Sequence, residues 1–333
     1  MIVPVHVAHT LANGTFSALA QWGGSFIIEI GASDRNTADV ELLPRMQDAF
    51  LVTAEPLLEK AARAIGRRRP ANRVKDVSEP LGLQHDRGLV LPIAIGPTSH
   101  PHGEMQTFYV GGIAGCSSLA NLSATPASFA DWCRDQRLAR QVWTQPLSRL
   151  LQQLPWRAHV KLVKIDAQGY DLKVIESAGQ RISTVEYVAM EVVSDDCRPI
   201  YAGQPQCSTI VAQMTRMGFR PLGEVPCRPK FQRVRMNACE LDIVFQNARM
   251  MEGPDQPPVP RVISELHNIR FNGCSSMYFR SSPVDRLHIK ITPPWSRDYY
   301  GPGGRKDNTT FGKLYACPGE CAHGFASELP CPW

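Results

Sequence analysis

The sequence predicts an α/β fold with a doubly wound sheet of seven mostly parallel strands and helices on both faces. Short runs rich in Val, Ile and Leu alternate with segments of helical periodicity between Ser25 and Ala248, which is typical of βαβ units. The 333 residues, 43% of them hydrophobic, suffice to bury one large core. The last two strand candidates have no helix between them, so we expect an antiparallel hairpin, and hence a reversed edge strand.

The strand candidates are short, apolar and rich in β-branched residues; they span residues 26–31, 50–55, 89–96, 160–167, 185–193, 219–225 and 240–248. Helices are expected at about 37–48, 56–68, 144–153, 170–178 and 207–217. The helix from Asp171 is the best marked, because Leu172, Ile175 and Ala178 share one face. Gly179 stands where a left-handed C-cap would end it.

Composition divides the chain into a main domain and an extension. We expect a main domain over residues 1–250, with its core at 25–248. An insertion at about 97–143 contains "MQTFYVGG" and "GCSSLANL", and we expect it to form a short β excursion that covers a site. The proline-rich "MEGPDQPPVP" indicates a linker. Residues 251–333 form a Cys/Pro/Gly-rich C-terminal appendage, which we expect to pack on the main domain.

Charge and hydropathy argue against two classes of partner. The net charge of +5 is dispersed, and the only compact basic run is Arg67–Arg69 with Lys75 nearby. Such short runs usually solvate a helix end, so we expect no nucleic-acid partner. No apolar run approaches the ~18 residues that a membrane span needs, so none is expected. The first residues lack a basic start and a sustained apolar core, which predicts a soluble, cytoplasmic chain unless the true N-terminus is missing.

The cysteines and sequons leave a secretory lumen open as the alternative compartment. The chain has ten cysteines and three N-x-S/T sequons, at Asn13, Asn121 and Asn308. Four of the cysteines fall in the last quarter of the chain. There a Cys3His zinc site, disulfides and free thiols are all compatible with the spacing of Cys317, Cys321, His323 and Cys331.

No metal site is predicted in the main domain. His100 and His102 lie in a loop, where they either are solvated or form part of a metal or base site.

The first strand ends in a turn that suits a ligand. Glu29, Gly31, Ala32, Ser33 and Asp34 cluster there, and ligands of doubly wound sheets bind at the carboxyl ends of strands. A glycine allows close approach of the backbone, and the next helix would offer free N–H groups. The alternative is an ordinary tight turn between strand and helix.

The second strand ends in Glu55 and Pro56, and Glu55 follows Gly31 by 24 positions. An acid at that separation commonly accepts hydrogen bonds from the two hydroxyls of a ribose. The dinucleotide fingerprint G-x-G-x-x-G is absent after Gly31, so a pyrophosphate would have no cradle and would meet an acidic turn. A cationic cofactor without phosphate fits better, which points to S-adenosylmethionine.

The string "VKIDAQGYDLKVIESAG" supplies the candidates for catalysis. Lys164 and Asp166 share a face of the strand, and Asp166 stands at its carboxyl end. An Asp near a methyl donor could orient the cofactor, bind an acceptor hydroxyl or act as a base. The alternative is a Lys–Asp pair plus a helix cap formed by Asp171. Glu191, in an apolar strand, is either a paired structural acid or part of the site.

Residues 26 to about 248 resemble the FkbM family of S-adenosylmethionine-dependent methyltransferases. The pieces that carry the resemblance are "IIEIGAS", "LVTAEPL", "VLPIAIG", "SSL", "PLSRLLQ", "VKIDAQGYDLKVIESAG" and "VAMEV", in that order. The resemblance implies a class I, Rossmann-like methyltransferase fold. It also implies methylation of a hydroxyl oxygen, on a small molecule or a sugar.

The resemblance also implies roles for particular residues. The turn around Gly31 would face the methionine part of the cofactor, and Glu55 its ribose. Ser118 would lie near the adenine or the acceptor, and Asp166 beside the transferred methyl. One departure is Arg35, which stands where the family usually has a second glycine. Arg35 and the Cys-rich tail are the basis of an alternative hypothesis, a catalytically inactive binding or interaction module with this fold.

Overall fold

The computed structural model describes residues 23–33, 38–66, 87–111, 115–123, 133, 138–155, 158–225, 227–228, 239–251 and 259–266. Several sequence predictions concern residues outside these ranges: the turn residues Asp34–Thr37, the basic run Arg67–Arg69, the sequons at Asn13 and Asn308, and the cysteines of the tail.

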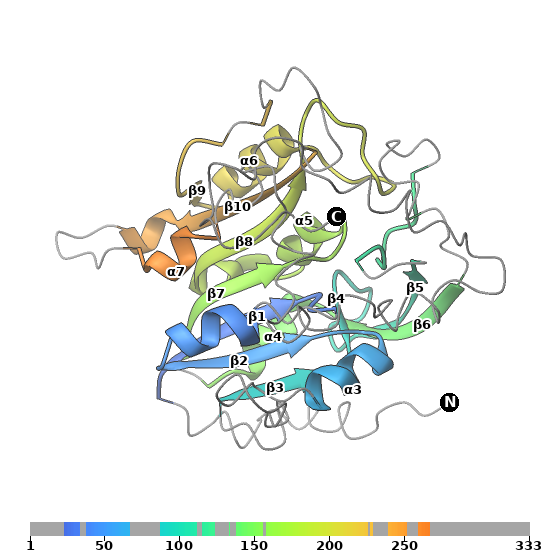
Figure 1. Ribbon diagram of the computed structural model, residues 1–333, viewed down its shortest axis with the longest axis horizontal. Helices are drawn as coiled ribbons and strands as arrows, with labels where there is room; N and C mark the ends of the chain where they lie inside the picture. The colour runs from blue at the N-terminus through green and yellow to red at the C-terminus, as the bar shows by residue number, and fades with distance from the viewer. Residues whose placement is uncertain are drawn as a thin grey trace, which may run out of the picture.

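A seven-stranded sheet forms the centre of the molecule, as predicted (Figure 1). Its strands are β1 (Ser25–Ile30), β2 (Ala49–Ala54), β3 (Gly88–Leu91), β7 (His159–Ile165), β8 (Val185–Val193), β9 (Phe219–Pro221) and β10 (Glu240–Asn247). Their spatial order is β3-β2-β1-β7-β8-β10-β9. The five strands β3, β2, β1, β7 and β8 are all parallel to one another. From β1 the strand order runs through β2 to β3 on one side, and the chain then continues with β7 and β8 on the other side of β1. Doubly wound folds bind ligands where the strand order reverses in this way.

The antiparallel pair predicted at the edge of the sheet is confirmed. β10 runs antiparallel to β8 on one side and to β9 on the other. The reversed strand is thus one position inside the edge, and β9 is the edge strand itself.

The predicted strand at 89–96 is divided between two sheets. Gly88–Leu91 forms β3 of the main sheet, whereas Ala94–Ile95 forms β4 of a three-stranded sheet with the order β4-β6-β5. Pro92 lies between the two parts, and proline cannot donate to a central ladder. The other strands, β5 (Glu104–Val110) and β6 (Leu138–Gln145), come from the insertion, so the expected β excursion is confirmed.

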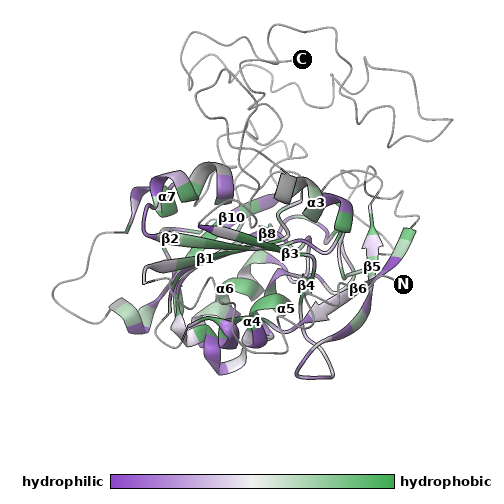
Figure 2. Cartoon of the chain, turned by 90° about the horizontal axis from the view of Figure 1, so that it is seen from below, coloured by the Kyte–Doolittle hydropathy of each residue, from purple (hydrophilic) through white to green (hydrophobic). Residues whose placement is uncertain are grey.

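Helices cover both faces of the main sheet, so that the fold has three layers (Figure 2). Their bounds are α3 (Leu58–Gly66), α4 (Leu147–Gln153), α5 (Asp171–Glu176), α6 (Cys207–Arg216) and α7 (Arg261–Ser264). Figure 2 places α4, α5 and α6 on one face, and α3 and α7 on the other. Gly179 has a φ of 55°, the left-handed conformation expected after the helix from Asp171. It begins a 3-10 turn, Gly179–Thr184, and another 3-10 turn, Ala248–Met251, follows β10.

The helix expected at 37–48 takes a different form. The described part is a π-helical turn, Ala38–Leu42, followed by a 3-10 turn, Leu43–Arg45. Pro44 stands in the first positions of the 3-10 turn, where its lack of an N–H costs nothing but where a continuing α-helix would need one. The segment still packs on the sheet, because Leu42 and Leu43 are buried.

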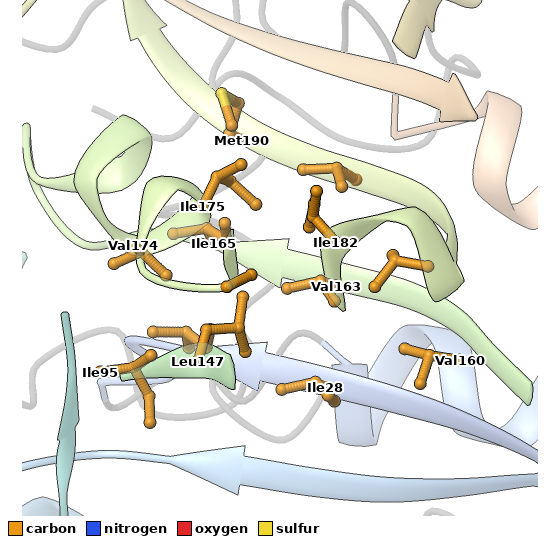
Figure 3. Close-up of a cluster of buried hydrophobic side chains, with 14 of the residues drawn as sticks. Ile28, Ile95, Leu147, Val160, Val163, Ile165, Val174, Ile175, Ile182 and Met190 are labelled. Atoms are coloured by element: carbon orange, nitrogen blue, oxygen red, sulfur yellow. The ribbon is translucent and has the colours of Figure 1, made fainter. Parts of the chain in front are cut away.

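The larger half of the core lies between the sheet and helices α4, α5 and α6. Figure 3 shows Ile28, Val163 and Met190, from three neighbouring strands, facing Leu147 of α4 and Ile175 of α5. Alternate residues of each strand point to opposite faces, so Ile27 and Leu162 belong to the core on the other side. There they pack with Val262, Ile263 and Leu266, so residues 259–266 add a layer to the main sheet.

Six of the cysteines form three disulfides among the described residues: Cys116–Cys133, Cys197–Cys239 and Cys207–Cys227. Cys116–Cys133 lies within the insertion. The other two connect the loop after β8, through Cys197, and the first residue of α6, Cys207, to the segment between β9 and β10.

Among the described residues, no helix is both long enough and apolar enough to cross a bilayer.

The central position of Ile28 predicts a large effect of truncation. Ile28 has an exposed fraction of 0%, whereas Leu138 is 58% exposed. We expect Ile28→Ala to lower the free energy of unfolding by about 2–5 kcal/mol, because it removes buried methyl groups and leaves a cavity. Leu138→Ala should change it by less than about 0.5 kcal/mol. Urea unfolding followed by circular dichroism measures both; equal effects would contradict this account of the core.

Candidate active site

Three parallel strands bring their carboxyl ends to one edge of the sheet. The backbone ladder continues just past the strands: Gly31 N–H donates to Ala54 O (3.0 Å), and Asp166 N–H donates to Ile30 O (2.9 Å). Glu55 N–H donates to Leu91 O at 3.0 Å. Gly31, Glu55 and Asp166, which are far apart in the sequence, are therefore held side by side.

An open cleft lies at this edge, between the ends of β1, β2 and β7 and the insertion; its empty space, including the solvent at its open side, is about 640 Å³. Its walls are mostly apolar, and a few polar groups enter it. The lining residues are Ile30, Gly31, Ser33, Ala54, Glu55, Pro56, Lys60, Ile93, Ala94, Ile95, Phe108, Gly115, Ser117, Leu119, Asp166, Ala167, Gln168 and Tyr170. Apolar walls with a few convergent polar groups are typical of small-molecule and cofactor sites.

Gly31 cannot be replaced without moving the backbone of the neighbouring strand end. Its φ is 79°, and a Cβ on Gly31 would lie 2.0 Å from Asp166 O. The next turn residue, Ser33, also has a positive φ, of 50°. The turn after β1 is therefore pressed against the turn after β7, with no side chain between them.

Glu55 is an acid held in place by backbone donors. Its carboxylate accepts hydrogen bonds from Ser33 N–H (2.8 Å) and Leu57 N–H (3.0 Å), and its exposed fraction is 3%. The Lys60 ammonium donates to the Ser33 hydroxyl at 2.8 Å, which places a cation in the same wall of the cleft. Each carboxylate oxygen has a second lone pair, so further donors can be accepted from the cleft.

Glu29 lies behind the cleft and not in its lining. The side chain is fully buried; Oε1 accepts from Ala38 N–H (3.0 Å) and lies 3.6 Å from Lys164 Nζ on the neighbouring strand. Burial raises the pKa of Glu29, and Lys164 opposes this shift. Glu29 therefore links the end of β1 to the helical turn that begins at Ala38.

The turn after β7 carries a polar network. The Gln168 amide nitrogen donates to Asp166 Oδ1 (2.6 Å) and to Glu191 Oε2 (3.0 Å), and the Tyr201 hydroxyl donates to Gln168 Oε1 (3.0 Å). Of the two roles considered for Glu191, the structure shows the paired acid: its exposed fraction is 8%, and it does not line the cleft.

Asp171 braces this turn and does not cap its own helix. Its two carboxylate oxygens accept from Ala167 N–H (3.3 Å) and Gly169 N–H (3.1 Å), both of which precede α5. The N-cap residue of α5 is Tyr170, which makes no capping hydrogen bond through its side chain. The helix cap proposed as the alternative role of Asp171 is therefore wrong, because the N–H groups that it binds belong to the turn and not to the helix. Burial, and secondarily the charge of Asp166, raises the pKa of Asp171 to about 7.

The insertion is anchored to the same turn by Ser118. Its hydroxyl donates to Ala167 O (3.2 Å) and accepts from Ala120 N–H (2.9 Å), and its exposed fraction is 1%. Its neighbours Ser117 and Leu119 line the cleft. Ser118 is therefore an anchor of the cleft wall and does not itself line it.

The predicted site residues fall into three groups. The cleft brings together Gly31, Ser33, Glu55, Pro56 and Asp166. Glu29, Ala32, Lys164 and Ser118 lie beside or behind the lining. Asp34 is outside the described residues.

Several lining residues are not predicted as site residues from the sequence, among them Lys60, Ile93, Phe108, Gln168 and Tyr170. Only two of them carried a usable signal, because Gln168 and Tyr170 closely follow Asp166 in the turn.

Among the described residues, no group of three or more His, Cys, Asp or Glu side chains could hold a metal ion. His100 and His102 are exposed and do not line the cleft. Of the two roles considered for them, the structure favours solvated loop residues.

Comparison with known families identifies the family of the chain. The family model of the methyltransferase FkbM domain matches residues 29–221, which is more than half of the chain. The chain belongs to the FkbM methyltransferase family. The match begins at Glu29, ends at β9, and contains every residue of the cleft.

One solved structure, described as "Structure of an antibiotic related Methyltransferase", also resembles this FkbM-family chain. It shares 10% sequence identity, covers 74% of this chain and 94% of its own, and has a TM-score of 0.28. Values this low establish nothing about activity. No curated protein sequence matches the chain.

The raised pKa of Asp171 predicts a specific pH dependence of stability. The pKa is about 7 in the folded chain, whereas the ordinary value for an aspartate is 3.8. The folded chain therefore binds the extra proton between these values, and its stability falls as the pH rises through this window. Asp171→Asn cannot titrate. We expect the unfolding free energy of the wild type, relative to Asp171→Asn, to fall by up to about 4 kcal/mol between pH 4 and 8.

Urea unfolding of both proteins at one-unit pH intervals measures this difference. The lost carboxylate shifts the variant by an amount that does not depend on pH, so only the slope of the difference is diagnostic. Parallel curves for the two proteins would contradict the raised pKa.

Proposed function

We propose that the chain is an S-adenosylmethionine-dependent methyltransferase that methylates a hydroxyl oxygen on a small molecule or a carbohydrate. The observation that carries this proposal is the cleft, in which Gly31, Glu55 and Asp166 meet at the carboxyl ends of three adjacent parallel strands. Membership in the FkbM methyltransferase family supports the reaction class.

The residues of the cleft fit this cofactor. When bound, S-adenosylmethionine supplies a methyl group on a positively charged sulfonium. Glu55, fixed by the N–H groups of Ser33 and Leu57, is suited to accept hydrogen bonds from the ribose hydroxyls. The turn around Gly31, with Ser33 and Pro56 also in the lining, would hold the methionine part of the cofactor. Acids at two strand ends favour a cation over a pyrophosphate.

Asp166 is the proposed catalytic residue. It lines the cleft at the end of β7, where its carboxylate can orient an acceptor hydroxyl and accept its proton. Methyl transfer is an in-line displacement, so the protein mainly has to align two reactants and remove this proton. Lys164 would act from behind, through its contact with Glu29. The insertion, anchored by Ser118, would form the acceptor side of the cleft.

An inactive binding module with the same fold is the second candidate. Its basis, Arg35 and the Cys-rich tail within residues 251–333, lies outside the described residues. The two proposals differ in outcome. The module transfers no methyl group, whether or not it binds the cofactor, and removal of residues 251–333 would abolish its partner binding.

Glu55→Gln tests the cofactor. We expect the wild type to bind S-adenosylmethionine in calorimetric titrations, and Glu55→Gln to weaken binding by roughly tenfold to a hundredfold. The expected loss reflects hydrogen bonds to a charged group, worth about 1.5–3 kcal/mol. Glu59→Gln is the matched control, since Glu59 is a half-exposed acid near the start of α3 that pairs with Arg140 at 2.6 Å. Equal binding by Glu55→Gln and the wild type would refute the ribose assignment.

The reaction itself is tested with S-adenosylmethionine that carries a labelled methyl group, incubated with a pooled extract of small molecules and glycans. The proposal requires label on an ether oxygen, released by neither mild base nor protease. Asp166→Asn should reduce the transfer at least a hundredfold. Cofactor binding without any transfer by the wild type would favour the inactive module.

The disulfides bear on the compartment, and we further propose that the chain folds in an oxidising one, such as a secretory lumen. Three disulfides among the described residues are unusual for a protein of the reducing cytosol. The sequon residue Asn121 is exposed, as an acceptor of N-linked glycan would need to be.

Protein from its natural source should therefore retain three linked cysteine pairs. Alkylation under denaturing, non-reducing conditions followed by peptide mass spectrometry should recover Cys116–Cys133, Cys197–Cys239 and Cys207–Cys227 as linked peptides. A parallel sample reduced before alkylation is the control. Folded protein treated with a reductant, without denaturant, should also have a lower melting temperature, because each loop closure stabilises the fold by about 3 kcal/mol. Full alkylation of all six residues without reduction would contradict the proposal.

A further inference from the structure

The side-chain amide of Gln168 uses all of its ordinary hydrogen-bonding groups within one network. Its two N–H groups reach Asp166 Oδ1 (2.6 Å) and Glu191 Oε2 (3.0 Å), and its oxygen accepts from the Tyr201 hydroxyl (3.0 Å). The reversed amide would turn its oxygen toward two carboxylates. Only one orientation of this amide is therefore compatible with its surroundings.

Two neighbouring acids are connected by this one nitrogen. Asp166 lines the cleft, whereas Glu191 is buried behind it in β8. Carboxylates in one site repel each other unless donors lie between them, and hydrogen bonds to charged groups are among the stronger ones. Gln168 supplies both donors and so ties the acid in the cleft lining to the buried one.

The backbone of the turn is held in an uncommon conformation to place this amide. Gln168 has a φ of 52°, which residues with side chains rarely adopt and which often marks a functional site. Gly169, which follows with a φ of 80°, lies against the Tyr201 ring, because a Cβ there would be 2.6 Å from Tyr201 Cδ2. Asp171 holds the same turn through the N–H groups of Ala167 and Gly169.

Tyr201 connects this turn to the insertion. Its exposed fraction is 1%, and its neighbours bond to the sequon segment: Ala202 N–H donates to Asn121 O (2.8 Å) and Ser123 N–H donates to Ile200 O (2.8 Å). The segment 115–123, part of which lines the cleft, is thus fixed to the Asp166 turn by Ser118 and by the Tyr201 loop.

We propose that Gln168 is a positioning residue, which holds the Asp166 carboxylate in one direction at the cleft, and that the Tyr201 hydroxyl fixes the amide that does so. This inference rests on the proposed function, since the direction of the carboxylate matters only if it faces a reacting group. Neither residue needs to touch the cofactor or the acceptor to have this effect.

Binding selectivity provides a readout that does not depend on the acceptor. S-adenosylmethionine and S-adenosylhomocysteine differ in the methyl group and its positive charge. A carboxylate aimed at the sulfonium favours binding of S-adenosylmethionine. The preference is the dissociation constant of S-adenosylhomocysteine divided by that of S-adenosylmethionine, and this ratio reports where Asp166 points. A general loss of protein stability would weaken the binding of both ligands by the same factor and leave the ratio unchanged.

The experiment compares Gln168→Ala, Gln168→Glu and Tyr201→Phe with the wild type by calorimetric titration of both ligands. We expect Gln168→Ala to weaken S-adenosylmethionine binding by roughly tenfold and S-adenosylhomocysteine binding by less than about threefold. Tyr201→Phe keeps the ring against Gly169 and should lower the preference by roughly threefold.

Gln168→Glu separates positioning from simple charge. An added negative charge near the cleft would by itself attract the cationic ligand and raise the preference. A carboxylate at this place cannot supply the two donors and repels Asp166, so the positioning role requires the preference to fall.

Two matched controls should leave the ratio unchanged. Gln106→Glu alters an amide that also donates to a carboxylate, Glu104 at 2.8 Å, but does not line the cleft. Tyr187→Phe removes the hydroxyl of another buried tyrosine, which accepts from Gln246 at 3.1 Å. The melting temperatures of Tyr201→Phe and Tyr187→Phe, compared in parallel, show whether their effects on folding are similar.

An unchanged ratio in Gln168→Ala, or a raised ratio in Gln168→Glu, would overturn the positioning role while leaving the proposed function intact. A wild type that binds neither ligand would instead overturn the proposed function, and this inference with it. A lower ratio in all three variants and in neither control would support the role.

Discussion

The site depends on the contact between the turns after β1 and β7. Asp166 N–H donates to Ile30 O, and the Asp166 carbonyl occupies the space where any other residue at Gly31 would carry its Cβ. This contact extends the parallel ladder by one residue beyond the strands. It therefore sets the separation between the edge of the cleft that holds Glu55 and the edge that holds Asp166, because β1 lies between β2 and β7.

Three acids at or behind this edge accept hydrogen bonds from backbone N–H groups. Glu55, Glu29 and Asp171 each accept from main-chain donors, and Glu29 is in addition close to Lys164. Main-chain donors cannot move away as a long cationic side chain can, so they hold these side chains in place. Of the acids at this edge, Glu55 and Asp166 line the cleft, and they are the two on which the proposed binding of a cationic cofactor depends.

The sequence predicts those parts of the fold that depend on residues close together in the chain. β-Branched runs mark the strands, Gly31 marks a close contact, and the spacing of Glu55 marks a second strand end. The division of 89–96 between two sheets had no such mark except Pro92, because alternation of residues does not say which sheet a strand joins.

Long-range contacts account for what the sequence did not reveal at the site. Lys60 reaches Ser33, Phe108 comes from the insertion, and Tyr201 reaches Gln168 across 33 positions. Each depends on two segments that meet only in the folded chain. The cysteines follow the same rule, since their spacings did not indicate which would pair.

The passage of the chain from β3 to β4 has a consequence for the wall of the cleft. Only Pro92 and Ile93 connect the two sheets there, and Ile93 is fully buried while also lining the cleft. A link of two residues, with the Ile93 side chain in the core, keeps β4 next to the end of β3. The same side chain thus belongs both to the core of the main sheet and to the wall of the cleft, so a change at Ile93 would alter the packing of the fold and the shape of the cleft together.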